Sequence, residues 1–228
     1  MLATFFIEIA YIIYILLRYK ASHATRLAIA ILFSLAIFQL AEYFICERPE
    51  FGSEIWARAG FIAITALLPL GIHFIYALAG RSWNWVIGIA YGTAVAWVLA
   101  FSFIPGVFNY YGCGGNYAIF YVTEGVGDIY FLYYYFWLFA GVILSLKYSL
   151  KINKKRQAAK QSLMLFMIAY LGFLVPTTIV NAVKPETMVG IPSIMCGFAI
   201  ILATIITFMI IPRMSKRKNQ DNVKPVKK

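Results

Sequence analysis

The stretch that decides the fold is Val189–Ile211, VGIPSIMCGFAIILATIITFMII, in which 23 successive residues carry no charge. As a helix it would be about 35 Å long, enough to cross the hydrocarbon core of a bilayer. Backbone N–H and C=O groups in lipid must be satisfied within their own segment, so such a run forms a helix. The stretch therefore predicts a membrane-spanning helix.

Six further apolar runs precede this one, and the composition of the chain is also that of a membrane protein. Hydrophobic residues make up 62% of the 228 residues and charged residues only 13%, about half the charged fraction of a soluble domain. We therefore predict an all-α integral membrane protein, a seven-transmembrane helix bundle. One domain covers residues 1–213, and residues 214–228 form a basic cytoplasmic tail without a core. The predicted spans are Leu2–Leu17, Leu27–Cys46, Ile55–Gly80, Trp85–Phe103, Ile129–Tyr148, Leu163–Val183 and Val189–Ile211.

The charges are distributed unequally between the two sides of these spans. All but three of the 20 Lys and Arg residues fall on one side, the exceptions being Arg48, Arg58 and Lys184. All acidic residues except Asp221 lie toward the other side. Because basic loops stay in the cytoplasm, we expect the N-terminus outside and the C-terminus in the cytoplasm of a cell-membrane protein. The net charge of +11 then faces anionic lipid, and we expect no nucleic-acid partner.

The longest connection between spans, Ile104–Asp128, is predicted to lie outside as an ordered lid or a short strand pair. Cys113 lies in this connection, and Cys46 ends the second span. Both are predicted to lie outside, where a disulfide is chemically allowed. A bridge would hold the connection over an outer cleft, but the sequence leaves the separation of the two residues open.

Ionisable groups at membrane depth are costly, so we treat them as candidates for function. Gln39 and Glu42 lie three residues apart and share a helical face. Arg58, near the start of the next span, has a similar expected depth. We predict an ion pair between Glu42 and Arg58, or a network that also includes Glu8. Such a pair would fasten a helical hairpin, contact a ligand, or do both.

Three more residues extend this candidate site. Thr65 follows Arg58 along the third span at helical spacing, and Glu124 and Asp128 lie one turn apart at the start of the fifth. The predicted ligand-binding residues are Glu8, Gln39, Glu42, Arg58, Thr65, Glu124 and Asp128.

The remaining reactive residues argue against several classes of protein. His73 is predicted to be alone at membrane depth, with His23 in a cytoplasmic loop, so a three-histidine zinc centre is excluded. No Ser/His/acid or Cys/His set can be placed at one depth. The seventh span has no Lys to carry retinal. We expect no enzyme, no cofactor and no metal.

Short motifs in the second and third spans resemble a known family. The sequence FQLAEY over residues 38–43, WARAG over 56–60, LPL over 68–70 and HF over 73–74 is similar to the seven-helix sensor region at the N-terminus of some prokaryotic sensor histidine kinases. A Tyr-rich fifth span and the basic segment Lys151–Lys160 fit more loosely. The resemblance covers about residues 5–213.

The resemblance implies a sensing module. The chain ends at Lys228 without a phosphoacceptor helix or an ATP-binding domain, so kinase activity does not carry over. We expect a receptor-like sensor that binds a small-molecule or lipidic ligand on its outer side. Its signal would pass through Lys151–Lys160 and the tail to a separate cytoplasmic or membrane protein. The alternatives are a small-solute transporter or channel, and a scaffold subunit without a ligand.

Overall fold

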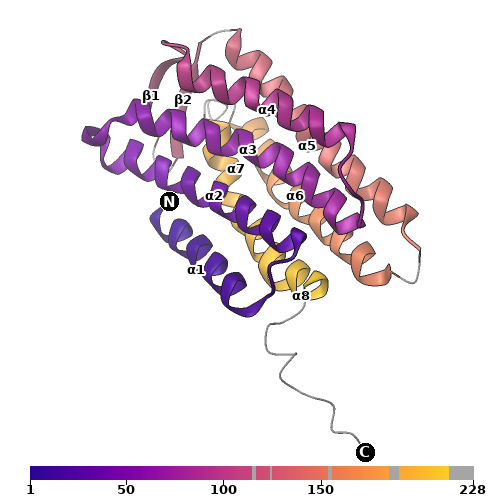
Figure 1. Cartoon of the computed structure of the whole chain (residues 1–228). Coiled ribbons are helices and arrows are strands. Elements are labelled where there is room, and N and C mark those ends of the chain that lie inside the picture. The colour runs from indigo at the N-terminus through magenta and orange to yellow at the C-terminus, as the bar shows by residue number, and fades with distance from the viewer. Residues whose placement is uncertain (115–116, 124, 154–155, 185–189, 216–228) are drawn as a thin grey trace, which may run out of the picture.

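The structure, a computed structural model, describes residues 1–114, 117–123, 125–153, 156–184 and 190–215. Within these ranges the chain is mainly helical (Figure 1). The tail predicted over 214–228 lies outside the described residues from 216 onward. The helices are α1 (Leu2–Arg18), α2 (His23–Glu47), a 3₁₀ turn η1 (Pro49–Phe51), α3 (Ser53–Ala79), α4 (Trp85–Phe103), α5 (Val126–Lys151), α6 (Gln157–Val183), α7 (Ile191–Ile205), a π-helical turn η4 (Ile206–Ile210) and α8 (Ile211–Met214).

Six of these helices are long and apolar enough to cross a membrane. They are α2 to α6 and the continuous helix formed by α7, η4 and α8. The chain is therefore a multi-pass, all-α membrane protein. The first predicted span is also a helix, but α1 has 17 residues and is shorter than the others.

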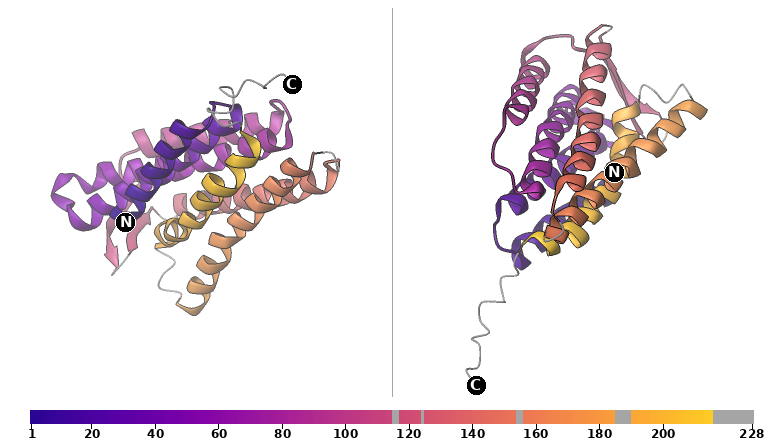
Figure 2. Two further views of the ribbon diagram at one scale, coloured as in Figure 1. Left: turned by 90° about the horizontal axis from the view of Figure 1, so that it is seen from below. Right: turned by 90° about the vertical axis from the view of Figure 1, so that its right-hand side faces the viewer.

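The helices pack lengthwise into one bundle (Figures 1 and 2). The helix α3 packs against α2, α4, α5 and α6. Two thirds of its 18-residue apolar stretch is buried inside the protein. The helix α7 lies against α1, α2 and α6. By contrast, only 22% of the apolar stretch of α4 is buried, so α4 lies at the periphery of the bundle.

The connection between α4 and α5 contains a hairpin, which confirms the predicted short strand pair. Its strands are β1 (Phe108–Gly114) and β2 (Tyr117–Val122), paired antiparallel. The hairpin contacts α2, α3, α5 and α7 at one end of the bundle. We call this the hairpin end, and we call the end where α8 leads into the tail the tail end.

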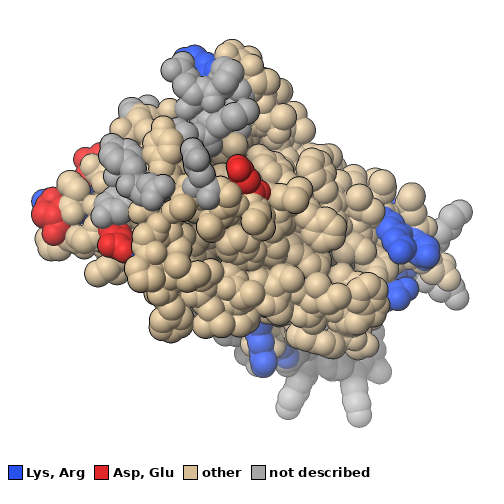
Figure 3. Space-filling model, turned by 90° about the horizontal axis from the view of Figure 1, so that it is seen from above, with Lys and Arg blue, Asp and Glu red and all other residues tan. Residues whose placement is uncertain are grey.

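Most charged side chains lie toward the two ends of the molecule. In the view from above, most acidic groups lie at one end and most Lys and Arg side chains at the other, and one acidic group lies near the middle of this face (Figure 3). The surface between is otherwise uncharged, as contact with lipid requires.

A basic side chain closes α3 at the tail end. Gly80 ends the helix in the left-handed conformation, with φ of +66°. Arg156 donates from Nη1 to the carbonyl oxygen of Ala79 at 3.1 Å. Because a Cβ on residue 80 would meet the Arg156 guanidinium, glycine also makes room for this cap.

Candidate functional site

The polar groups predicted on α1 and α2 are buried together. The exposed fraction is 0% for Glu8 and 2% for both Gln39 and Glu42. The two helices run in opposite directions (Figure 1). Side chains lean toward the N-terminal end of their own helix, so Glu8 leans toward the hairpin end and Glu42 leans away from it. The two carboxyl groups therefore converge, and they interact electrostatically. We call Glu8, Gln39 and Glu42 the carboxyl cluster.

Hydrogen bonds satisfy the carboxyl cluster only in part. Thr4 Oγ1 donates to Gln39 Oε1 at 2.7 Å, and the Glu42 carboxyl hydrogen-bonds the hydroxyl of Ser193 on α7. The amino group of Met1 interacts electrostatically with Glu42. Four buried atoms of the cluster have no hydrogen-bond partner: both carboxylate oxygens of Glu8, Gln39 Nε2 and Glu42 Oε1.

No basic side chain among the described residues pairs with the carboxyl cluster. The ion pairs in this part of the chain are Arg48–Glu50 and Arg58–Glu54, both on the loop and helix after α2. A charged group at membrane depth costs about 3 kcal/mol when unpaired. The Met1 amino group is the cation that acts on Glu42, and the cluster still has unfilled acceptor positions for further hydrogen-bond donors.

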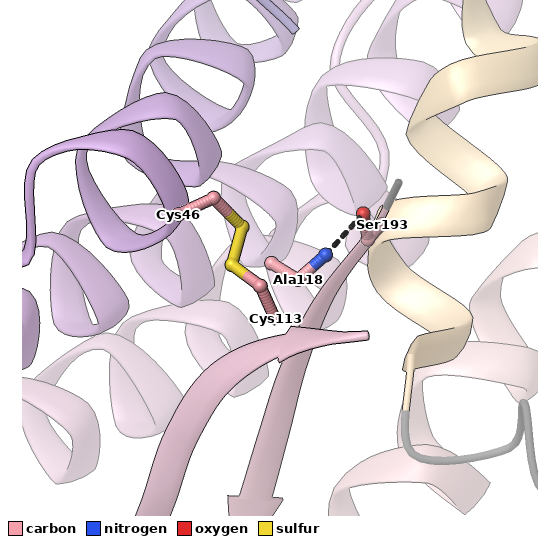
Figure 4. The surroundings of a disulfide bond; sticks show 4 residues. All are labelled: Cys46, Cys113, Ala118 and Ser193. Carbon is pink, nitrogen blue, oxygen red and sulfur yellow. Dashed lines mark hydrogen bonds between the residues drawn. A yellow bond between two sulfur atoms is a disulfide. The ribbon is translucent and has the colours of Figure 1, made fainter. Parts of the chain in front are cut away.

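A disulfide and a hydrogen bond join the hairpin to the end of α2 and to α7, next to the carboxyl cluster (Figure 4). The backbone N–H of Ala118 on β2 donates to Ser193 Oγ at 3.0 Å, and Ser193 in turn contacts Glu42. Cys46 and Cys113 form a disulfide, with their Cα atoms 5.5 Å apart. The bridge that the sequence left open thus joins the end of α2 to β1. Together the two links hold the hairpin over the carboxyl cluster.

A narrow apolar cavity lies on the other side of the cluster, between α2, α3, α5, α6 and α7. Cys196 lines this cavity and also interacts electrostatically with Glu8 and Glu42, although none of the three cluster residues lines the cavity itself. The remaining lining is apolar or aromatic, including Leu35, Tyr134 and Met195. The volume of the cavity is about 30 Å³, far below the roughly 150 Å³ of a cavity that binds benzene.

The predicted ion pair between Glu42 and Arg58 is wrong. The Arg58 guanidinium pairs with Glu54 one turn earlier, at 2.8 Å from Nη2 to Oε1. It also donates to the carbonyl oxygens of Phe101 and Ile104 at the C-terminal end of α4. The rotation of α3 explains the difference, because it turns Arg58 toward α4 while Glu42 faces α1 and α7.

The other predicted residues lie apart from the carboxyl cluster. Thr65 is buried beneath the hairpin, where its hydroxyl donates to the Phe61 carbonyl and contacts Tyr130 Oη at 2.9 Å. Asp128 is exposed in the first turn of α5. Glu124 lies outside the described residues.

Three contributors to this region were missed at the sequence level. Thr4, Ser193 and Cys196 are short side chains in apolar runs, and nothing in their spacing marks them. Ser193 has one usable signal, because its place near the start of the last span predicts the same depth as Glu42.

The statement that His73 is alone is also wrong. His23 Nε2 lies 3.0 Å from His73 Nε2, at the tail end of the bundle. The helix α2 begins at His23, so this residue meets the last turns of the antiparallel helix α3.

Comparisons of the chain with protein family models, with curated proteins and with solved structures found no match.

Proposed function

We propose that the chain is a receptor-like membrane sensor whose carboxyl cluster binds a small, positively charged ligand from the outer side. The observation that carries the proposal is the burial of Glu8 and Glu42 without a basic side chain to pair with them. A ligand ammonium group would add positive charge and several N–H donors to the single cation, the Met1 amino group, that interacts with Glu42. The unpartnered Gln39 Nε2 would donate to an acceptor on the same ligand.

The adjoining cavity favours ligands that also carry an apolar group. The cavity has a volume of only about 30 Å³, so the side chains around Cys196 and Met195 would have to move apart to admit an alkyl or aryl chain next to the ammonium group. Burial of apolar surface gives roughly 25 cal/mol per Å², so this part would add affinity to the charged contact. Amines with a hydrophobic body are therefore the ligand class we propose.

The proposed topology places this site outside. The excess of Lys and Arg assigns the tail end to the cytoplasm. Seven spans, with α1 as the first, then leave the N-terminus and the hairpin end outside. A disulfide at the hairpin end agrees with this assignment, because disulfides persist in oxidising compartments.

We propose that α7 carries the response to the cytoplasmic side. It holds Ser193 next to the ligand site and continues through η4 and α8 to Ser215. There Ser215 Oγ contacts Ser22 Oγ at 2.9 Å and Thr25 Oγ1 at 2.7 Å, at the start of α2. The π-helical turn η4 interrupts the regular hydrogen bonding of the helix, and such turns are frequent at functional sites. A ligand that favours one position of α7 would shift the population at the tail end.

The resemblance to histidine-kinase sensor regions agrees with this function. By analogy, the output partner would be a cytoplasmic signalling protein that contacts the basic segment Lys151–Lys160 and the tail. A transporter would instead need polar groups along the whole path of the solute across the membrane. Below the cluster, the buried polar groups of the described residues are mainly separate hydroxyls, such as Ser145, Ser162 and Thr207.

Thermal unfolding of the purified protein in detergent tests the ligand class. Hexylamine and phenethylamine are the probes, and hexanol and benzyl alcohol are the uncharged controls. A ligand at 100 times its Kd stabilises a protein by about 2.7 kcal/mol, so we expect the amines to raise Tm and the alcohols not to. Glu8→Gln and Glu42→Gln should abolish the shift, and Glu54→Gln, an exposed acid at the same end, should keep it. Equal shifts in all four proteins, or no shift in the wild type, would contradict the proposal.

A further inference from the structure

The two histidines of the chain meet at the tail end, far along the sequence from one another. His23 is the first residue of α2, held there by Ser22, whose hydroxyl accepts a hydrogen bond from the N–H of Thr25. His73 lies near the end of α3. Their Nε2 atoms are 3.0 Å apart, and the ring centroids are 4.8 Å apart. His23 is exposed and His73 is half-buried, so water has access to the pair.

A second contact fixes the His73 ring. Its Nδ1 lies 3.2 Å from Tyr91 Oη on α4, and its edge meets Trp83 with centroids 5.6 Å apart. Trp83 also stacks on Tyr91, with centroids 5.8 Å apart. When Nδ1–H donates to Tyr91, the Nε2 lone pair of His73 points toward His23. A hydrogen bond on the second ring nitrogen is the usual way in which proteins orient a metal-binding histidine.

The separation of the two Nε2 atoms fits a shared metal ion. Zinc binds histidine nitrogen at about 2.0–2.1 Å, so two imidazoles on adjacent coordination positions have their nitrogens roughly 2.9–3.4 Å apart. The observed 3.0 Å lies in this range. Imidazole is a ligand suited to Zn²⁺, Cu²⁺ and Ni²⁺, with Cu²⁺ the most strongly bound of the three.

We propose that His23 and His73 form a two-histidine site for a divalent transition-metal ion at the tail end of the bundle. No group of three or more His, Cys, Asp and Glu side chains converges within the described residues, so water completes the coordination. Without metal, one Nε2–H donates to the other Nε2. Metal binding removes this hydrogen bond: each ring keeps one proton, on Nδ1, and each Nε2 lone pair bonds to the ion.

Such a site would join the start of α2 to the end of α3. In this site, His23 is next to Ser22 and close to Thr25, and both of these residues contact Ser215 beyond α8. Metal binding would therefore restrain the region where we place the cytoplasmic output. The proposal is independent of the amine site at the other end, because it uses different residues and a different ligand. It replaces the earlier expectation of no metal, which assumed that the histidines lie apart.

The test uses the full chain purified in detergent with a tag that contains no histidine. Zn²⁺ is titrated at neutral pH by isothermal calorimetry into the wild type, His23→Gln, His73→Gln and Tyr91→Phe. We expect one Zn²⁺ per chain and loss of at least tenfold in affinity in either histidine variant. Tyr91→Phe keeps both ligands but loses the orienting hydrogen bond, so its affinity should fall by roughly tenfold. Circular dichroism on each variant confirms that it is folded.

Fluorescence quenching by Cu²⁺ supplies a second measurement that locates the ion. Cu²⁺ bound at His73 would quench Trp83, whose ring is 5.6 Å away. Trp83→Phe keeps an aromatic ring against His73 and leaves the Tyr91 hydrogen bond in place, so it should lose most of the quenching but keep Zn²⁺ binding to within a few-fold. Trp97→Phe should retain the quenching. Equal Zn²⁺ affinity in the wild type and both histidine variants would overturn the proposal. So would the absence of binding of either metal to folded wild-type protein, which would leave the pair a simple N–H···N hydrogen bond.

Discussion

Arg58 is the residue whose observed contacts differ most from those its sequence position suggests. Its guanidinium closes the C-terminal end of α4 through two carbonyl oxygens, and Glu54 pairs with it from the preceding turn. Its side chain is only 19% exposed. It therefore stabilises the packing of α3 against α4 and lies outside the proposed ligand site.

Replacement of Arg58 by Met should lower stability without changing amine binding. The carbonyl oxygens of Phe101 and Ile104 would lose a charged donor, and such hydrogen bonds contribute about 1.5–3 kcal/mol. Thermal unfolding in detergent should show a lower Tm, with the amine-induced shift retained. Glu54→Gln, a change at a side chain that is 54% exposed, should have a smaller effect. Loss of the amine shift at unchanged Tm would instead place Arg58 in the site.

Ser193 connects the hairpin to Glu42, and its replacement by Ala should weaken both. The buried N–H of Ala118 would lose its acceptor, and Glu42 would lose a donor. We expect faster hydrogen exchange at Ala118 and amine affinity reduced several-fold. Ser145→Ala is the matched control, because that hydroxyl is also buried but has no hydrogen-bond partner. If both variants behave alike, the Ser193 connection has no role in ligand binding.

At the scale of the element, the disulfide and the hairpin act together. The bridge closes a sequence separation of 67 residues. In the chain-entropy model a loop of this length gives up to about 4 kcal/mol of stabilisation. Its other effect is local, since it fixes β1 beside the end of α2.

Cys46→Ser combined with Cys113→Ser should loosen the hairpin more than the bundle. We expect faster hydrogen exchange in β1 and β2, a lower Tm, and helix content unchanged by circular dichroism. The Cys196→Ser variant is the control, because this buried thiol lies outside the bridge. Unchanged exchange in both strands after loss of the bridge would show that the disulfide does not hold the hairpin.

The helices were predictable from the sequence because length and apolarity alone define them, whereas the strand pair was one of two alternatives for its connection. All seven apolar runs form helices, and the connection Ile104–Asp128 contains the strand pair. It was less predictable which side of each helix faces the interior of the bundle. A helix in lipid is apolar on its outside as well as its inside, so periodicity marks the buried face only weakly. The predicted shared face of Gln39 and Glu42 is therefore correct, since both are buried, whereas the predicted surroundings of Arg58 and His73 are wrong.

At the scale of the whole molecule, the two ends carry different proposed roles. The hairpin end has the disulfide and the carboxyl cluster, and the tail end has the histidine pair and the contacts of Ser215. The α7–η4–α8 helix links them. This division has meaning only if the two ends face opposite sides of the membrane.

Seven spans with opposite termini should be visible in a protease protection assay. A short epitope is fused to either end of the chain, and sealed right-side-out vesicles are treated with protease. We expect loss of the N-terminal epitope and protection of the C-terminal one, with the reverse in inside-out vesicles. Cleavage of both epitopes from the same side would mean that α1 does not span, leaving the six helices whose length and apolarity suffice alone.

The central claim, that the carboxyl cluster binds a cation from outside, is tested most directly by equilibrium binding of radiolabelled phenethylamine to sealed vesicles. We predict saturable binding to right-side-out vesicles of the wild type and of Glu54→Gln, and none to Glu8→Gln or Glu42→Gln. Binding of equal affinity to the wild type and to both Gln variants would contradict the account.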